Sequence, residues 1–130
     1  MLEINNLTKK RINKSRLQKI ALAFFKKYKF SLNRDISLAI VTDRKMKTIN
    51  LAYRGQDKTT DVLSFSDLDE ILISYDQVSR QAKDSGRSAK GELEFIFVHG
   101  LLHLAGFRDD TEKGRLKMIA EGESFLEDIA

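Results

Sequence analysis

The 130-residue chain contains no cysteine, no proline and no tryptophan. Without cysteine it cannot form disulfide bonds, use a thiol nucleophile or build a cysteine zinc site, which fits a reducing compartment. The N-terminal residues lack the apolar stretch of a signal peptide, and no window approaches the length of a membrane span. We therefore expect a cytoplasmic protein with no membrane partner. With three tyrosines and no tryptophan, there is little sign of an aromatic platform for RNA bases.

The remaining composition is typical of a folded globular protein, with 42% hydrophobic and 32% charged residues. At this length we expect one domain, residues 1–130, with a core of its own. No internal repeat, low-complexity segment or linker interrupts the chain. Because proline is absent, the turns must depend on Gly, Asn, Asp and Ser.

The net charge of +4 is unevenly distributed. Residues 1–34 contain ten Lys or Arg and one acid, whereas residues 92–130 contain four bases and nine acids. A basic N-terminal third suits a polyanionic partner such as RNA. The alternative is a lysine-rich helix face that is simply solvated.

Hydrophobic periodicity predicts helices and strands that alternate along the chain. Several predicted strands follow one another without a helix between them, which favours an α+β fold over a doubly wound parallel sheet. Asp43 is the expected cap of the second helix. The predicted helices are 15–28, 43–53, 76–90, 92–106 and 111–127, and the predicted strands are 36–42, 60–66, 71–75 and, at an edge, 2–6.

The helix predicted over 92–106 is apolar nearly all round, so we expect it in the core. It carries the only two histidines, His99 and His103, whose i, i+4 spacing puts both imidazoles on one face, within reach of one cation. Gly106 is expected to end the helix, after which Asp109 or Asp110 can supply a third ligand. Three ligands and an open position for an activated water form a catalytic zinc site. The alternative is a pair of core histidines satisfied by hydrogen bonds.

The two-histidine helix also raises the possibility of a metallopeptidase. In the HExxH helices of that class, a glutamate general base follows the first histidine. Gly100 occupies this position here. Glu92 and Glu94 lie more than a turn upstream, so the peptidase interpretation is disfavoured.

Three stretches resemble the YbeY family of metal-dependent endoribonucleases and ribosomal RNA maturation factors. HGLLHLAGF (99–107) is similar to that family's HGxLHLxGY(D)H signature. AYRGQDKTTDVLSFS (52–66) and LDEILIS (68–74) are similar to two further family segments. Their order and spacing match over roughly residues 36–110. The resemblance implies a single zincin-like α+β domain, with a small mixed sheet, a buried central metal-binding helix and surrounding helices.

The sequence departs from the family at the third metal ligand. The family's histidine, six positions after the second, is replaced by Asp109, and Arg108 stands where the family has aspartate. Aspartate is a competent zinc ligand, but its charge weakens the cation as a Lewis acid. Its harder oxygen also makes the site more tolerant of manganese or magnesium. Asp110 is the second candidate ligand, because Asp109 alone preserves the family spacing.

The resemblance implies cleavage of single-stranded RNA and maturation of small-subunit ribosomal RNA, with the ribosome or its small subunit as partner. His99, His103 and Asp109 would hold one divalent metal, with zinc as first choice, and no nucleotide cofactor is expected. Arg54 takes the family's catalytic arginine position, where its guanidinium can grip a phosphate. The alternative for Arg54 is a surface ion pair with Asp57 or Asp61.

Two other side chains are assigned minor roles. Thr60 and Asp61 are expected to hold their loop and strand, and Ser64 lacks a base that could make it a nucleophile. A non-catalytic RNA-binding assembly factor with a structural metal remains the main alternative function. A small metallopeptidase is the weaker one.

Overall fold

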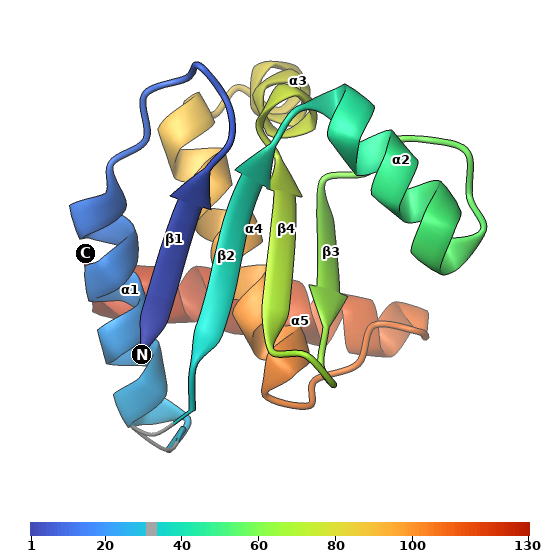
Figure 1. Ribbon diagram of the computed structural model, residues 1–130. Helices are drawn as coiled ribbons and strands as arrows, with labels where there is room; N and C mark the ends of the chain where they lie inside the picture. The colour runs from blue at the N-terminus through green and yellow to red at the C-terminus, as the bar shows by residue number, and fades with distance from the viewer. Residues whose placement is uncertain (31–33) are drawn as a thin grey trace.

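The computed structural model describes residues 1–30 and 34–130. In these residues four strands form one mixed sheet in the order β1-β2-β4-β3 (Figure 1). Strands β1, β2 and β4 are mutually parallel, and β3 runs antiparallel to β4. This mixed sheet confirms the predicted α+β class, including the predicted edge strand at the N-terminus. The strands are β1 (Leu2–Asn6), β2 (Ile36–Val41), β3 (Val62–Phe65) and β4 (Glu70–Ser74).

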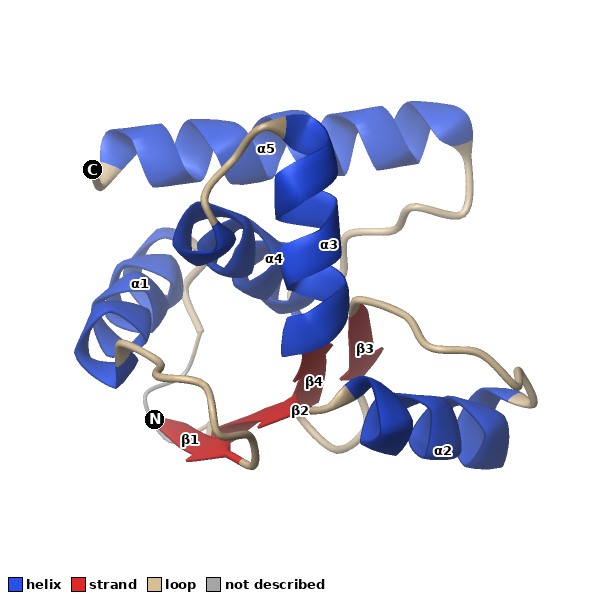
Figure 2. Ribbon diagram, turned by 90° about the horizontal axis from the view of Figure 1, so that it is seen from above, coloured by secondary structure: helices blue, strands red, loops and turns tan. Residues whose placement is uncertain are grey.

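Five helices surround the sheet in the described residues, four on one face and α2 on the other (Figure 2). Strand periodicity explains this division. Leu38 and Ile40 point into the main core, whereas Val41 packs with Met46 of α2 and Leu63 of β3 on the opposite face. The helices are α1 (Lys14–Lys27), α2 (Asp43–Arg54), α3 (Tyr75–Ser85), α4 (Ala89–Leu104) and α5 (Glu112–Asp128).

Helix α4 is the centre of the fold, as its apolar sequence predicts. It packs against α3, α5, β3 and β4, and its side chains Phe97, Val98, Leu101 and Leu102 are completely buried. Helix positions buried on every side must be apolar all round. Within the described residues, no helix combines the length and hydrophobicity needed to cross a membrane.

Two predicted helix boundaries are wrong. The helix predicted over 76–90 stops at Ser85, and α4 begins at Ala89 rather than at 92. Serine caps a helix better than it continues one, and the Ser88 hydroxyl accepts a hydrogen bond from Gly91 N at 3.0 Å. The cap of α2 is Thr42 rather than Asp43, because the Asp43 carboxylate is engaged by other elements.

Candidate metal centre

The two histidines lie on the last two turns of α4. Their rings are 5.0 Å apart at an interplanar angle of 82°. The helix ends as predicted, with Gly106 at a φ of +99°. Its N–H donates to the His103 carbonyl and that of Phe107 to the Leu102 carbonyl, both at 3.0 Å. These two bonds form a Schellman motif, which turns the chain back across the histidines.

This turn brings Asp109 to both imidazoles. Its Oδ2 atom lies 3.4 Å from Nε2 of His99 and 3.2 Å from Nε2 of His103. The three ligand atoms lie within 4.8 Å of one another. Ligands about 2.1 Å from a tetrahedral zinc ion are roughly 3.4 Å apart, so the arrangement fits one ion. It is the only such cluster among the residues that the structure describes.

Asp110 is turned away from this cluster. Its Oδ2 atom lies 3.5 Å from a guanidinium nitrogen of Arg108, and both side chains are well exposed. Of the two candidate aspartates, the geometry therefore favours Asp109 as the third ligand.

A glycine on α5 leaves room for the ligand loop to pack closely against this helix, and the sequence reasoning missed it. Thr111 caps α5 by accepting from Gly114 N at 3.0 Å. A Cβ atom on Gly114 would lie 2.6 Å from the carbonyl oxygen of Arg108, closer than nonbonded atoms can approach. The available signal was a glycine three residues after a helix-capping threonine.

The surroundings of His99 favour its neutral form. Burial lowers the pKa of His99, and the nearby His103 lowers it further. The carboxylates of Asp109 and Asp61 oppose these effects without reversing them. The neutral imidazole is the form that binds metal.

A cleft of about 890 Å³ opens beside the cluster. The α4 residues that line it follow helical periodicity, so they form one wall. Glu92 belongs to this wall. It is nevertheless too far from the histidines to act as their general base, as the sequence suggested. Two turns separate it from His99, a rise of about 10 Å, and it pairs with Arg87 at 3.4 Å. The α4 lining residues are Glu92, Phe95, Ile96, His99 and His103.

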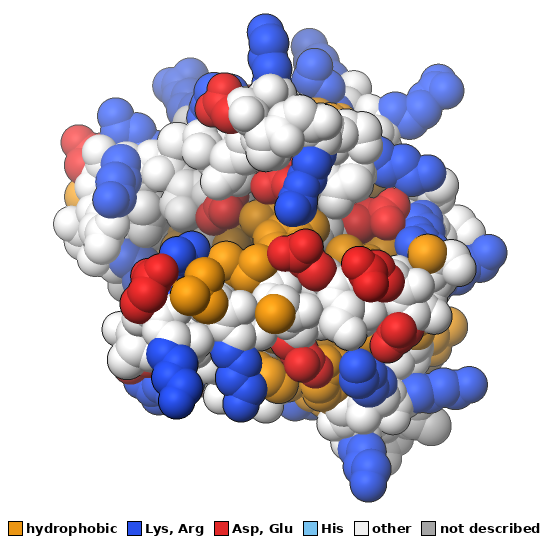
Figure 3. Space-filling model, turned by 180° about the vertical axis from the view of Figure 1, so that it is seen from behind, with side chains coloured by type: hydrophobic (Ala, Val, Ile, Leu, Met, Phe, Trp, Pro, Cys, Tyr) orange, Lys and Arg blue, Asp and Glu red, His pale blue; other side chains and the backbone are white. Residues whose placement is uncertain are grey.

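Charge on the helix-covered face is segregated. Figure 3 shows acidic side chains concentrated across the middle of this face, with Lys and Arg around its periphery. Helix α5 carries Glu121, Glu123 and Glu127 in its second half. A polyanion would therefore be repelled from the middle of the face and attracted to its rim.

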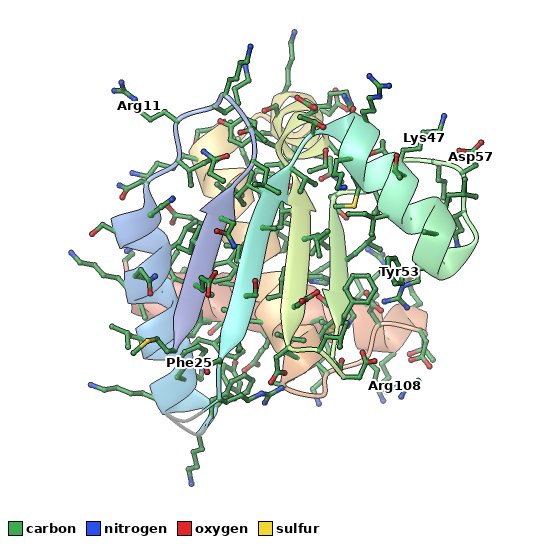
Figure 4. All side chains as sticks on the ribbon, in the orientation of Figure 1. Arg11, Phe25, Lys47, Tyr53, Asp57 and Arg108 are labelled. Carbon is green, nitrogen blue, oxygen red and sulfur yellow. The ribbon has the colours of Figure 1, made fainter. Side chains whose placement is uncertain are left out.

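Arg54 reaches the cleft from α2. Its guanidinium donates to the Ser64 carbonyl oxygen at 2.9 Å and lies 5.1 Å from the centre of the Phe65 ring. Asp57 pairs instead with Lys47 at 3.7 Å (Figure 4), and Asp61 accepts from the backbone N–H of Val62 and from Gln81. Among the described residues, neither aspartate forms the alternative ion pair with Arg54.

The space around Gly100 also bears on the chemistry. A Cβ atom there would lie 3.0 Å from a methyl group of Ile71 in β4, so any side chain at this position requires Ile71 to shift by a few tenths of an ångström. The Ser64 hydroxyl lies 3.4 Å from the Gly100 carbonyl and Glu94 pairs with Arg16. The site thus lacks the peptidase base at its expected position.

Known proteins resemble the chain over most of its length. A family profile described as "Endoribonuclease YbeY" matches residues 3–130. A protein of that name from Nitratiruptor sp. is 42% identical over 96 residues, covering 68% of this chain and 67% of its own length. One from Wolinella succinogenes is 33% identical over 128 residues, covering 93% and 86%. The fold is similar to a solution structure from Thermotoga maritima, with a TM-score of 0.70, 25% identity and coverage of 99% and 89%.

Proposed function

Since the chain belongs to the endoribonuclease YbeY family, we propose that it cleaves single-stranded RNA in the cleft beside His99, His103 and Asp109. The observation that carries this proposal is the convergence of three ligand atoms at the wall of an open cleft. The chain is an endoribonuclease by family. The next question is how the residues of the cleft would bind the scissile phosphate of the RNA.

The donor set suits zinc, because two imidazole nitrogens and one carboxylate oxygen are all ordinary zinc ligands. A bound zinc ion would supply Lewis acidity and lower the pKa of a coordinated water. The Asp109 carboxylate reduces both effects relative to a third histidine, since it adds negative charge. Manganese and magnesium are the alternatives that the oxygen ligand admits.

Arg54 is proposed to orient the scissile phosphate. One of its nitrogens donates to the Ser64 carbonyl, which fixes the direction of the guanidinium, and within the described part of the chain its other N–H groups have no hydrogen-bond partner. A planar guanidinium can hold two phosphate oxygens and stabilise the charge that builds on them. Arg108, which is 80% exposed, lines the same cleft and adds positive charge.

The natural substrate is proposed to be small-subunit ribosomal RNA in the cytoplasm, with the ribosome or its small subunit as partner. The family resemblance and the basic N-terminal third support this assignment. An assembly factor with a purely structural metal is less well supported. The core around α4 is built from apolar contacts, so we expect the fold to persist without an ion at the surface end of that helix.

The test is to remove the metal and measure both folding and cleavage. We expect chelator-treated protein to keep its far-ultraviolet circular dichroism and lose cleavage of single-stranded RNA, and zinc or manganese to restore it. Arg54→Ala should retain metal and lower kcat/KM by about 10²-fold, with Lys58→Ala, on the exposed loop after α2, as the matched control. Loss of the fold with the metal would contradict the catalytic assignment, and unchanged cleavage by Arg54→Ala would contradict the role of Arg54.

A further inference from the structure

The end of α2 carries an exposed aromatic side chain that the proposed cleavage chemistry does not use. Tyr53 is 69% exposed. Its ring contacts the ring of Phe65, with centroids 5.7 Å apart and planes at 69°. A side chain this exposed buries little apolar area, so it contributes little to folding. An exposed aromatic ring supported by a second ring suggests a binding role.

The position of this pair connects it to the cleft. Arg54, the next residue after Tyr53, lines the cleft, as do Ser64 and Ser66 on either side of Phe65. Because successive strand residues point to opposite faces, Phe65 faces α2 while the two serines face the cleft. Strand β3 is the last in the sheet. A polymer that leaves the cleft past Arg54 therefore crosses this edge and arrives at Tyr53.

The guanidinium of Arg54 lies between the cleft and the Tyr53–Phe65 pair. It lies over the Phe65 ring at 5.1 Å and reaches around β3 to the Ser64 carbonyl. Phe65 thus contacts both Arg54 and Tyr53. The arrangement places a phosphate-binding group and an exposed aromatic ring side by side, which are the two components of single-strand recognition.

We propose that Tyr53, supported by Phe65, stacks on a base of the RNA substrate next to the phosphate held by Arg54. This inference rests on the proposed function, since it assigns the position of a nucleotide bound at the same site. Every base has a π-face, so the contact would be tolerant of sequence. It would orient the strand across the edge of β3.

The experiment measures kcat and KM for a single-stranded RNA of about ten nucleotides, within the usual range of such sites. Tyr53→Ala should raise KM about fivefold or more, as loss of one stacked base does, and change kcat less than about twofold. Tyr53→Phe should behave as the wild type, because a phenyl ring stacks equally well. Leu22→Ala is the matched control, as Leu22 is 58% exposed and lies on α1, which contacts the opposite edge strand β1.

A second series replaces one nucleotide at a time by an abasic residue. One abasic position should raise the KM of the wild type as much as Tyr53→Ala does, and should have no further effect in that variant. An unchanged KM for Tyr53→Ala, as expected if the ring docks a protein instead, would overturn the proposal. Equal effects of every abasic position in both proteins would also overturn it. A wild type that cleaves no RNA would contradict the proposed function itself, and with it the stacking role.

Discussion

At the scale of single residues, Asp109 has the largest chemical consequence. The resemblance places it where the family has a histidine, and its carboxylate oxygen lies 3.2–3.4 Å from both histidines. The sequence alone left Asp109 and Asp110 open, and only the spacing of the resembled family favoured Asp109. It lies on the loop whose Arg108 carbonyl packs against Gly114.

Gly114→Ala should weaken metal binding by at least about tenfold, because the added methyl group would displace the Arg108 carbonyl and with it Asp109. Overpacking of this kind costs about 1–3 kcal/mol, partly offset by the better helix propensity of alanine. The measurement is a zinc titration with a competing chelator. Gly122→Ala is the matched control, since its Cβ would meet its neighbours no closer than 3.6 Å. Equal zinc affinities for the two variants would show that Gly114 does not position the ligand loop.

The residues found from sequence and those missed differ in a physical way. His99 and His103 follow from helical periodicity, a local property of the chain. The closeness of Gly114 to the Arg108 carbonyl and the path of Arg54 around β3 are set by how separate elements pack. The sequence signals the capped start of α5, but it does not show which backbone atom lies against Gly114 or where the Arg54 side chain runs.

At the scale of elements, α4 was predictable because a helix buried on all sides has an unmistakable apolar sequence. The junction between α3 and α4 was missed, because a single glycine in a polar segment does not by itself decide between a helix and a loop; here Gly86, at a φ of +71°, ends α3 and Ser88 caps α4. The role of Asp43 was also misassigned. Its carboxylate accepts from Ser74 at 2.7 Å and Thr59 at 2.9 Å and pairs with Arg80 at 2.6 Å, so it joins α2 to β4 and α3.

The contribution of the Asp43 contacts to the stability of the fold should be lost at acid pH. Burial raises the pKa of Asp43, but hydrogen bonds from Ser74, Arg80 and Thr59 lower it more, so it falls below 3.8. A carboxyl group whose pKa is lower in the folded state stabilises the fold above its unfolded pKa. That contribution is lost as the pH falls through the folded pKa.

Asp43→Asn should therefore lower the free energy of unfolding at pH 7 by about 1 kcal/mol, a value discounted for partial solvent exposure. The difference from the wild type should shrink below about pH 4. Urea unfolding at several pH values measures this. Asp57→Asn, in an exposed pair with Lys47, should change stability by less than about 0.5 kcal/mol. A difference that stays constant down to pH 2 would rule out the proposed linkage.

At the scale of the whole molecule, the basic N-terminal region and the cleft lie at opposite edges of the sheet, beside β1 and β3 respectively. No described residue before Arg54 lines the cleft. Arg11 lies beyond β1 and Arg108 near the opposite end of the sheet (Figure 4). Composition revealed the charge asymmetry, but only the topology shows that these positive charges lie away from the cleft.

Replacing Lys9, Lys10 and Arg11 with glutamate should weaken binding of a long RNA and lower its salt dependence. The slope of log affinity against log salt should fall by up to about 2, because each phosphate that the protein neutralises adds about 0.7 to that slope. An oligonucleotide short enough to occupy the cleft alone should be bound and cleaved as by the wild type. An equal decrease in affinity for short and long RNA would mean that the region acts through the cleft or the fold.

The proposed cleavage chemistry requires His99, His103 and Asp109 together to hold a metal ion. The most direct measurement is metal per chain by elemental analysis on untagged protein, for the wild type, Asp109→Ala and the matched control Asp110→Ala. We predict about one ion per chain for the wild type and Asp110→Ala, and a strongly reduced content for Asp109→Ala. No metal in the wild type after incubation with zinc or manganese, or equal content in all three proteins, would contradict the account.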